Sequence, residues 1–209
     1  MFKCEGFRRR RKAERPAEIL DAAFAAFADR GYAATRLEDV AARAGVTKGT
    51  IYLYFPTKEK LFEDMVRSHS AGLLSEADAF LAGAEGTSAD RLRTLLHFLY
   101  TRCVEDRCGR EILRFMVAEG KLFPQLVAEN YRDFVMPMLA MVNALVDQGV
   151  AAGQFRADLP RETVRIVIAP TFFLSVIRLI FGDAPPVDEE AYVEAHINMA
   201  LAGLLAKPA

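Results

Sequence analysis

Two short amphipathic segments joined by a three-residue turn, Gly45-Val46-Thr47, limit what this chain can fold into. Apolar residues in 37–44 recur at helical spacing, and Gly45 supplies the positive φ that ends such a helix. Thr47 predicts the next helix start, because its hydroxyl can accept a hydrogen bond from a first-turn amide. That helix should end at Phe55, since Pro56 disfavours a helical conformation in the residue before it. Helices this short need tertiary support, and with a long helix on either side they predict a helix-turn-helix.

Side-chain pairs near the turn support these boundaries. Thr35 and Glu38 have the spacing of a capping box, in which each side chain would bond to the other residue's backbone amide. Val46 and Ile51 occupy the positions of a hydrophobic staple. Upstream, residues 16–31 carry apolar side chains at helical spacing between a proline and a glycine, which predicts an amphipathic helix.

The remaining sequence also has a helical period, and its breaks are rich in turn-forming residues. Helices are predicted over 58–81, 89–104, 110–118, 124–151, 161–181 and 188–205. No convincing strand alternation appears, so we expect an all-α fold of about nine helices. With 209 residues and 52% apolar composition, the chain can bury a sizeable core.

Charge is distributed unevenly along the chain. Residues 1–60 carry 13 Lys and Arg against 8 Asp and Glu, whereas residues 61–209 carry 14 against 20. A basic end joined to an acidic remainder is a weak indication of nucleic-acid binding at the basic end.

Several classes of protein are disfavoured by what the sequence lacks. The three cysteines and three histidines have no zinc-like spacing, and no catalytic motif is found, so we expect no metal, no cofactor and no enzymatic activity. No signal-peptide pattern follows the basic N-terminus, which favours a cytoplasmic protein. The apolar run 166–177 is too short and too interrupted to span a bilayer, so we expect no membrane partner.

The helix predicted from Lys48 has an outward face that is unusual for solvent. Ile51 and Phe55 should point inward, which leaves Leu53 exposed between two tyrosines. In a DNA major groove the same face is coherent: Gly49 allows close approach, Lys48 can reach a guanine or a phosphate, and Leu53 can touch a thymine methyl. The hydroxyls of Thr50, Tyr52 and Tyr54 suit phosphate oxygens.

Basic residues flank this helix on both sides. Lys58 and Lys60 lie in the first turn of the next helix, where backbone amides and lysine together form an anion site, although a solvated helix start is the alternative. The run from Arg8 to Lys12 is interpreted either as a flexible arm for the DNA backbone or minor groove, or as a solvated tail.

Residues 17–62 closely resemble the DNA-binding domain of the TetR family of bacterial transcriptional regulators. The resemblance rests on Gly-Tyr-x-x-Thr before the second helix, on A-x-x-A-G-V, and on T-K-G-T-I-Y-x-Y-F-x-x-K-x-x-L. It implies an arm and a DNA-binding domain in residues 1–62 and an effector-binding and dimerisation domain in 63–209. The implied DNA-binding residues are Thr35, Thr47, Lys48, Gly49, Thr50, Tyr52, Tyr54 and Lys58, with Leu53 at a position that varies among relatives.

The resemblance further implies that the last two helices form a dimer. The residues agree, because 166–181 are apolar nearly all round, which a surface helix cannot hide unless another chain covers it. A two-fold dimer would hold two reading heads about 35 Å apart over a palindrome. The predicted interface residues are Phe173, Ile177, Phe181, Tyr192, Ile197 and Leu201.

A small-molecule site is harder to locate from sequence. The candidates combine apolar bulk with a few polar tips, as small-molecule pockets do. They are His97, Tyr100, Phe115, Glu119, Tyr131, Phe134, Met138, Met141 and Phe172, although Met and Phe at helical spacing more often belong to the core than to a pocket. Pro137 and Pro170 should each interrupt a helix and bend its axis.

These features together favour a homodimeric, ligand-responsive regulator, interpreted as a repressor that a small apolar or amphipathic effector releases from a palindromic operator in double-stranded DNA. The alternative is a helical small-molecule-binding or scaffold protein with a vestigial DNA-binding head. The two differ in whether the chain binds a palindrome in a salt-dependent manner.

Overall fold

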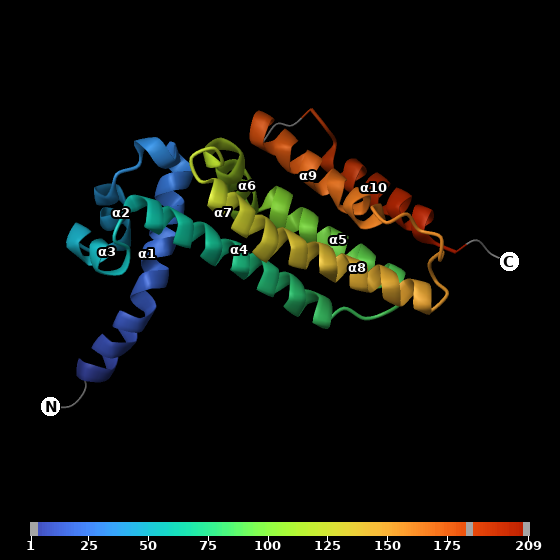
Figure 1. Ribbon diagram of the computed structural model, residues 1–209, viewed down its shortest axis with the longest axis horizontal. Coiled ribbons are helices and arrows are strands. Elements are labelled where there is room, and N and C mark those ends of the chain that lie inside the picture. The colour runs from blue at the N-terminus through green and yellow to red at the C-terminus, as the bar shows by residue number, and fades with distance from the viewer. Residues whose placement is uncertain (1–3, 183–185, 207–209) are drawn as a thin grey trace. The chain divides into compact units, whose positions relative to one another are not determined.

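The computed structural model describes residues 4–182 and 186–206, and it describes side chains from Arg15 onward. The chain divides into two compact units, Met1–His69 and Ser70–Ala209. Helices make up almost all of both units (Figure 1), and within the described ranges the only strand-like pairing is an isolated bridge between Phe155 and Leu205. The predicted all-α class is therefore confirmed.

The first unit contains α1 (Cys4–Ala34), α2 (Leu37–Ala44), α3 (Lys48–Tyr54) and the beginning of α4 (Lys58–Ala82). The predicted start of the first helix near Pro16 is wrong, because α1 begins at Cys4 and continues through the proline. Its expected end is found at Gly31, whose φ of 74° breaks the helical geometry. The predicted arm, Arg8 to Lys12, lies outside the residues whose side chains are described.

Aromatic packing explains where the first unit ends. Phe62 on α4 contacts Phe27 on α1 edge-to-face with ring centroids 5.2 Å apart, and it also contacts Tyr32 at 5.0 Å. Two turns later, His69 stacks on Phe24 at 4.5 Å. Because α4 continues to pack against α1 beyond Phe62, the division at His69 falls later than the boundary predicted after residue 62.

The second unit is a bundle built from the rest of α4 and the helices that follow it. These are α5 (Ser88–Tyr100), η1 (Thr101–Glu105), α6 (Arg107–Glu119), α7 (Pro124–Asn130), η2 (Tyr131–Val135), α8 (Met136–Ala151), α9 (Thr163–Phe181) and α10 (Glu189–Leu204). The elements η1 and η2 are single π-helical turns that continue α5 and link α7 to α8. Figure 1 shows α9 and α10 side by side at one edge of this unit.

The π-turn before α8 has a local cause. Pro137 has no amide hydrogen for the carbonyl of Asp133, the residue four positions earlier and a member of η2. A wider π-turn at this point accommodates the missing bond and lets the helix continue from α7 into α8. The predicted interruption at Pro137 therefore appears as a bulge within one long helical stretch.

The core of the second unit is apolar and is shared by α4, α5, α8, α9 and α10. Leu95 and Leu96 from α5, Val142 from α8 and Leu174 from α9 belong to one buried cluster. From α10, Ile197, Leu201 and Leu204 complete it, and all three are almost fully buried within the protomer.

Two helical stretches among the described residues are long and apolar enough to cross a membrane by length and composition, Pro124–Ala151 with 28 residues and Thr163–Phe181 with 19. The length argument made for residues 166–177 therefore does not hold for the whole of α9.

Candidate DNA-binding surface and ligand cavity

The recognition-helix candidate α3 is held in place by its inward side. Thr47 caps the helix, since its hydroxyl accepts a hydrogen bond from the Thr50 amide at 3.2 Å, as predicted. Ile51 is fully buried and Phe55 nearly so, and Phe55 ends the helix before Pro56. Gly45 adopts the predicted left-handed conformation, with a φ of 64°, so the turn between α2 and α3 is tight.

The outward side of α3 leaves large side chains in solvent. Tyr52 is 46% exposed and Leu53 is 73% exposed. A Cβ added at Gly49 would meet only the Thr47 hydroxyl oxygen, at an ordinary contact distance of 3.7 Å. The packing of the unit therefore does not require glycine at position 49. A glycine here is consistent with the predicted close approach of DNA to the helix backbone.

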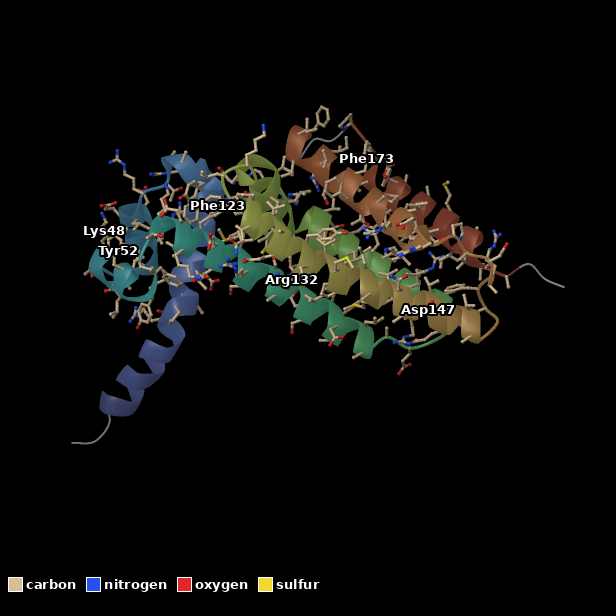
Figure 2. All side chains as sticks on the ribbon, in the orientation of Figure 1. Lys48, Tyr52, Phe123, Arg132, Asp147 and Phe173 are labelled. Carbon is tan, nitrogen blue, oxygen red and sulfur yellow. The ribbon has the colours of Figure 1, made fainter. Side chains whose placement is uncertain are left out.

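Lys48 has a partner that the sequence analysis did not identify. Its Nζ donates to the Glu38 carboxylate at 2.7 Å and lies 5.6 Å from the centre of the Tyr52 ring. The hydrogen bond to Glu38 raises the pKa of Lys48, and the same bond lowers the pKa of Glu38. Figure 2 shows Lys48 and Tyr52 close together on the first unit. Glu38 thus places a negative charge on the surface predicted to face DNA.

An open hollow of about 480 Å³ lies beside α3 and collects the candidate phosphate-binding groups. Its walls include Lys48, Tyr52 and Lys58 together with the backbone around the start of α2. Lys58 donates to the carbonyl oxygen of Ala33 at 3.2 Å, and its Nζ lies 4.5 Å from the centre of the Tyr32 ring. Arg36 lines the hollow as well, and so do two carboxylates, Glu38 and Glu59. The basic side chains suit an anion, whereas the two acids oppose one.

Thr35 does not have the role predicted for it. The Thr35–Glu38 capping box is wrong: the cap of α2 is Arg36, whose amide donates to Asp39 at 3.1 Å. The Thr35 side chain is buried, and its hydroxyl donates to the carbonyl oxygens of Gly31 and Ala26, at 2.7 and 3.1 Å. Thr35 still lines the hollow, but its hydroxyl proton is already directed to carbonyl oxygens of α1 rather than to a phosphate.

The second unit encloses an apolar cavity of about 340 Å³. Its wall takes residues from α4, α5, η1, α6, α7, η2, α8 and α9, and none of them carries a formal charge. Four of the predicted ligand-site residues line it: Tyr131, Phe134, Met138 and Phe172. Gly109 is required here, because a Cβ at that position would lie 2.1 Å from the Arg102 carbonyl oxygen and 2.8 Å from the Cα of Cys103.

Ser175 and Asn130 in this wall are hydrogen-bonded, whereas the hydroxyl oxygen of Thr171 is buried and has no hydrogen-bond partner among the described residues. The Ser175 hydroxyl lies within bonding distance of the carbonyl oxygens of Thr171, at 2.9 Å, and Cys103, at 3.1 Å. The Asn130 amide donates to Ser70 at 2.8 Å. Burial raises the pKa of the Cys103 thiol to about 11, so this side chain is neutral at physiological pH. The deep wall is therefore suited to an apolar group.

The other five predicted ligand-site residues lie outside this cavity, which corrects the sequence analysis. Phe115 is fully buried in the core, while Glu119 and Met141 lie outside the cavity wall. His97 and Tyr100 border a separate, polar hollow on α5 that glutamates also line. The Tyr100 hydroxyl bonds to His196 Nδ1 at 2.8 Å, so this tyrosine serves packing between α5 and α10. Burial raises its pKa.

An apolar stripe remains exposed on α9. Ile166, Phe173 and Ile180 are spaced seven residues apart and are 68%, 51% and 65% exposed (Phe173 is labelled in Figure 2). On α10 the exposed face carries Met199, which is 76% exposed, with Ala195 and Ala202 on the same face. Two of the predicted interface residues, Ile197 and Leu201, point into the core instead. The face of α10 that carries Ile197 and Leu201 was predicted to be exposed, and this prediction was wrong because the helix has apolar residues on both sides.

Comparisons with known proteins agree with the N-terminal motif. Residues 19–65 match the family model described as "Bacterial regulatory proteins, tetR family". The HTH-type transcriptional repressor KstR2 of Mycolicibacterium smegmatis is 29% identical over 196 residues, which cover 92% of this chain and 91% of that protein.

Solved structures extend the similarity across the second unit. A transcriptional regulator from Saccharomonospora viridis, in complex with choline, superposes with a TM-score of 0.80 at 20% identity, over 93% of this chain and 100% of that one. FadR from Bacillus subtilis, in complex with stearoyl-CoA, gives a TM-score of 0.70 at 18% identity, over 90% and 98%. At these identities the two structures establish the shared fold alone. The helix-turn-helix, the family match of residues 19–65 and the similarity to HTH-type regulators over most of the chain together support its assignment to the TetR family of bacterial transcriptional regulators.

Proposed function

We propose that this regulator is a repressor that reads a palindromic operator with the outward face of α3. The main support is that α3 is anchored by Ile51 and Phe55 while Tyr52 and Leu53 stay in solvent. Gly49 gives the helix backbone close access to the groove, and Leu53 is placed to contact a base. Thr47, Thr50 and Tyr54 complete the proposed contact set. The vestigial-head alternative is not favoured.

The phosphates on either side of the groove would be held at the hollow beside α3. Lys48, Tyr52 and Lys58 offer donors there, and each neutralised phosphate releases counterions, which makes binding depend on salt. Thr35 is left out of the contact set because its hydroxyl is buried.

We propose that two chains pair through α9 and α10. The heptad spacing of Ile166, Phe173 and Ile180 gives α9 a continuous apolar seam, and the small residues around Met199 let α10 approach closely. Ile177, Phe181 and Tyr192 remain candidates at the edge of this seam. A two-fold pair of chains accounts for the exposed apolar surface of α9 without a membrane, in keeping with a cytoplasmic regulator.

The effector would occupy the apolar cavity of the second unit. A neutral wall and a volume of about 340 Å³ suit an aliphatic or alicyclic group. Among the relatives, the complexes with stearoyl-CoA and choline show how widely ligands differ within one fold. Because the cavity wall is uncharged, it suits an apolar acyl chain, such as that of stearoyl-CoA, better than a small cation such as choline. The effector would act by favouring a dimer whose reading heads no longer match the operator.

Selection of binding sites from a random duplex library tests the DNA part of the proposal. A palindromic consensus is expected, and affinity for it should fall steeply with salt. Recovery of no consensus, or binding that does not respond to salt, would refute it.

The dimer is tested by Phe173→Arg, which places a charge in the α9 seam. Sedimentation should show a folded monomer with operator affinity reduced by at least about tenfold, because one reading head cannot hold both half-sites. Val117→Arg is the matched control, since Val117 is 70% exposed on α6 and is not one of the seam residues. If Phe173→Arg leaves a tight DNA-binding dimer, the seam has been assigned to the wrong surface.

A further inference from the structure

The apolar cavity of the second unit reaches solvent between η2 and α9. Two of its lining residues are half-exposed, Tyr131 on η2 at 45% and Phe172 on α9 at 56%. The other aromatic in the wall, Phe134, is only partly exposed. A ligand whose apolar part fills the cavity would therefore leave its remaining end beside Tyr131 and Phe172.

Two polar side chains at this mouth, Arg165 and Tyr131, can donate hydrogen bonds to a ligand. Arg165 on α9 donates from Nη1 to the Tyr131 hydroxyl at 3.1 Å. Because that oxygen accepts from the guanidinium, the tyrosine's own proton is directed elsewhere and can be donated to a ligand. The guanidinium has further N–H groups beyond the one that it gives to Tyr131. An acceptor group on the ligand would meet a phenol and a cation together.

The neighbouring charges leave Arg165 able to change partner. Its Nε lies 2.9 Å from a carboxylate oxygen of Glu162, the N-cap residue of α9, and both side chains are at least half-exposed. An exposed pair of this kind is weakly held, so a ligand anion bound in part by the cavity can compete for the guanidinium. Arg132, on η2, is instead engaged by Asp133, the adjacent residue, at 2.6 Å. Arg165 is thus the cation that is tied to the cavity wall, through Tyr131.

We propose that the effector is an amphipathic anion, with an aliphatic or alicyclic body in the cavity and a carboxylate-like head held by Arg165 and Tyr131. This inference rests on the proposed effector cavity and adds the charge and position of the head group. Charge-assisted hydrogen bonds from a guanidinium and a phenol favour a carboxylate over an uncharged or cationic head on the same body. Binding would connect η2 to α9, the helix that carries the proposed dimer seam.

The test compares three ten-carbon probes that differ only in their head groups: decanoate, decanol and decyltrimethylammonium. Titration calorimetry at neutral pH, below the micelle concentrations, measures each affinity for the full-length protein. The parent protein should bind decanoate on the order of tenfold more tightly than decanol, as expected for a hydrogen bond to a charged group. Arg165→Gln should abolish this preference while leaving decanol affinity unchanged. Tyr131→Phe should reduce the preference by a smaller factor.

Arg132→Gln is the matched control, because it removes a nearby exposed arginine that does not contact Tyr131. It should keep the preference for decanoate. Equal affinity of the parent for decanoate and decanol, or a preference that survives Arg165→Gln, would overturn the assignment of the head group while leaving the apolar cavity as the effector site. Failure of all three probes to bind would instead remove the proposed effector site, and this inference with it.

Discussion

Replacing Gly49 by alanine separates what the fold needs from what DNA needs. The added Cβ would have the Thr47 hydroxyl oxygen as its nearest neighbour, at 3.7 Å, so it fits without any shift of the surrounding atoms. Gly49 does not adopt a positive φ, so alanine is also compatible with the backbone. Alanine should therefore raise the free energy of unfolding by about 0.4–1 kcal/mol, through helix propensity and lower entropy of the unfolded chain.

DNA affinity should change in the opposite direction. If the backbone at Gly49 lies against the groove, a methyl group there acts as overpacking at a fitted surface, which costs about 1–3 kcal/mol. That cost corresponds to a loss of operator affinity of about 5- to 150-fold. Thermal unfolding and fluorescence anisotropy with a selected operator measure the two effects on the same preparation.

Gly72→Ala provides the control for this experiment. Gly72 lies within α4 and its added Cβ would meet nothing within 4 Å, so the variant should gain similar stability without loss of DNA affinity. An undiminished operator affinity of Gly49→Ala would show that the backbone of α3 does not approach the groove at this point, and the proposed docking of the helix would have to be abandoned.

Two further substitutions test charges that the structure locates. Glu38→Gln releases Lys48 from its 2.7 Å ion pair and removes an acid from the surface predicted to face DNA. Affinity for any duplex should therefore rise, and the slope of log K against log salt should steepen by about one. A flatter slope measured by anisotropy would contradict this. Burial raises the pKa of the Cys103 thiol from 9.0 to about 11. Above pH 9.0 the thiol therefore stays protonated in the folded state while it ionises in the unfolded chain. The free energy of unfolding should fall as pH rises through this range, by about 2 kcal/mol at pH 10.5. Urea titrations of Cys103→Ala at pH 8 and pH 10.5 should show a correspondingly smaller difference, and an unchanged difference would refute the shift.

Local signals in the sequence were sufficient to predict the helix-turn-helix. Gly45, Thr47 and Pro56 each act through their own backbone or through an amide a few residues away, and all three occupy the predicted positions. The prediction that Thr35 caps α2 was wrong because its hydroxyl donates instead to carbonyl oxygens of the preceding helix, α1, where the chain turns at Gly31. The partner of Lys48 was missed for a related reason, because Glu38 lies ten residues earlier on another helix.

The second unit was less predictable because its helices are apolar on more than one side. Periodicity placed α10 correctly, yet it could not distinguish the face of Ile197, which packs inward, from the face of Met199, which is exposed. The cavity posed a similar difficulty. Phe115 and Phe134 are equally plausible from composition, but only the arrangement of six or more elements around the void assigns Phe134 to its wall.

The two sides of α3 share no residue, and this separation has a consequence for specificity. Ile51 and Phe55 hold the helix in the unit, whereas Tyr52 and Leu53 make few contacts with it. If Leu53 contacts a base as proposed, substitutions there should change base preference at little cost in stability, because its side chain is 73% exposed and lies outside the packing of Ile51 and Phe55. The same logic places Leu53 rather than Lys48 as the residue most free to diverge: Lys48 is already bonded to Glu38, so a change there disturbs two side chains at once. A regulator built in this way can acquire a new operator without rebuilding its DNA-binding unit.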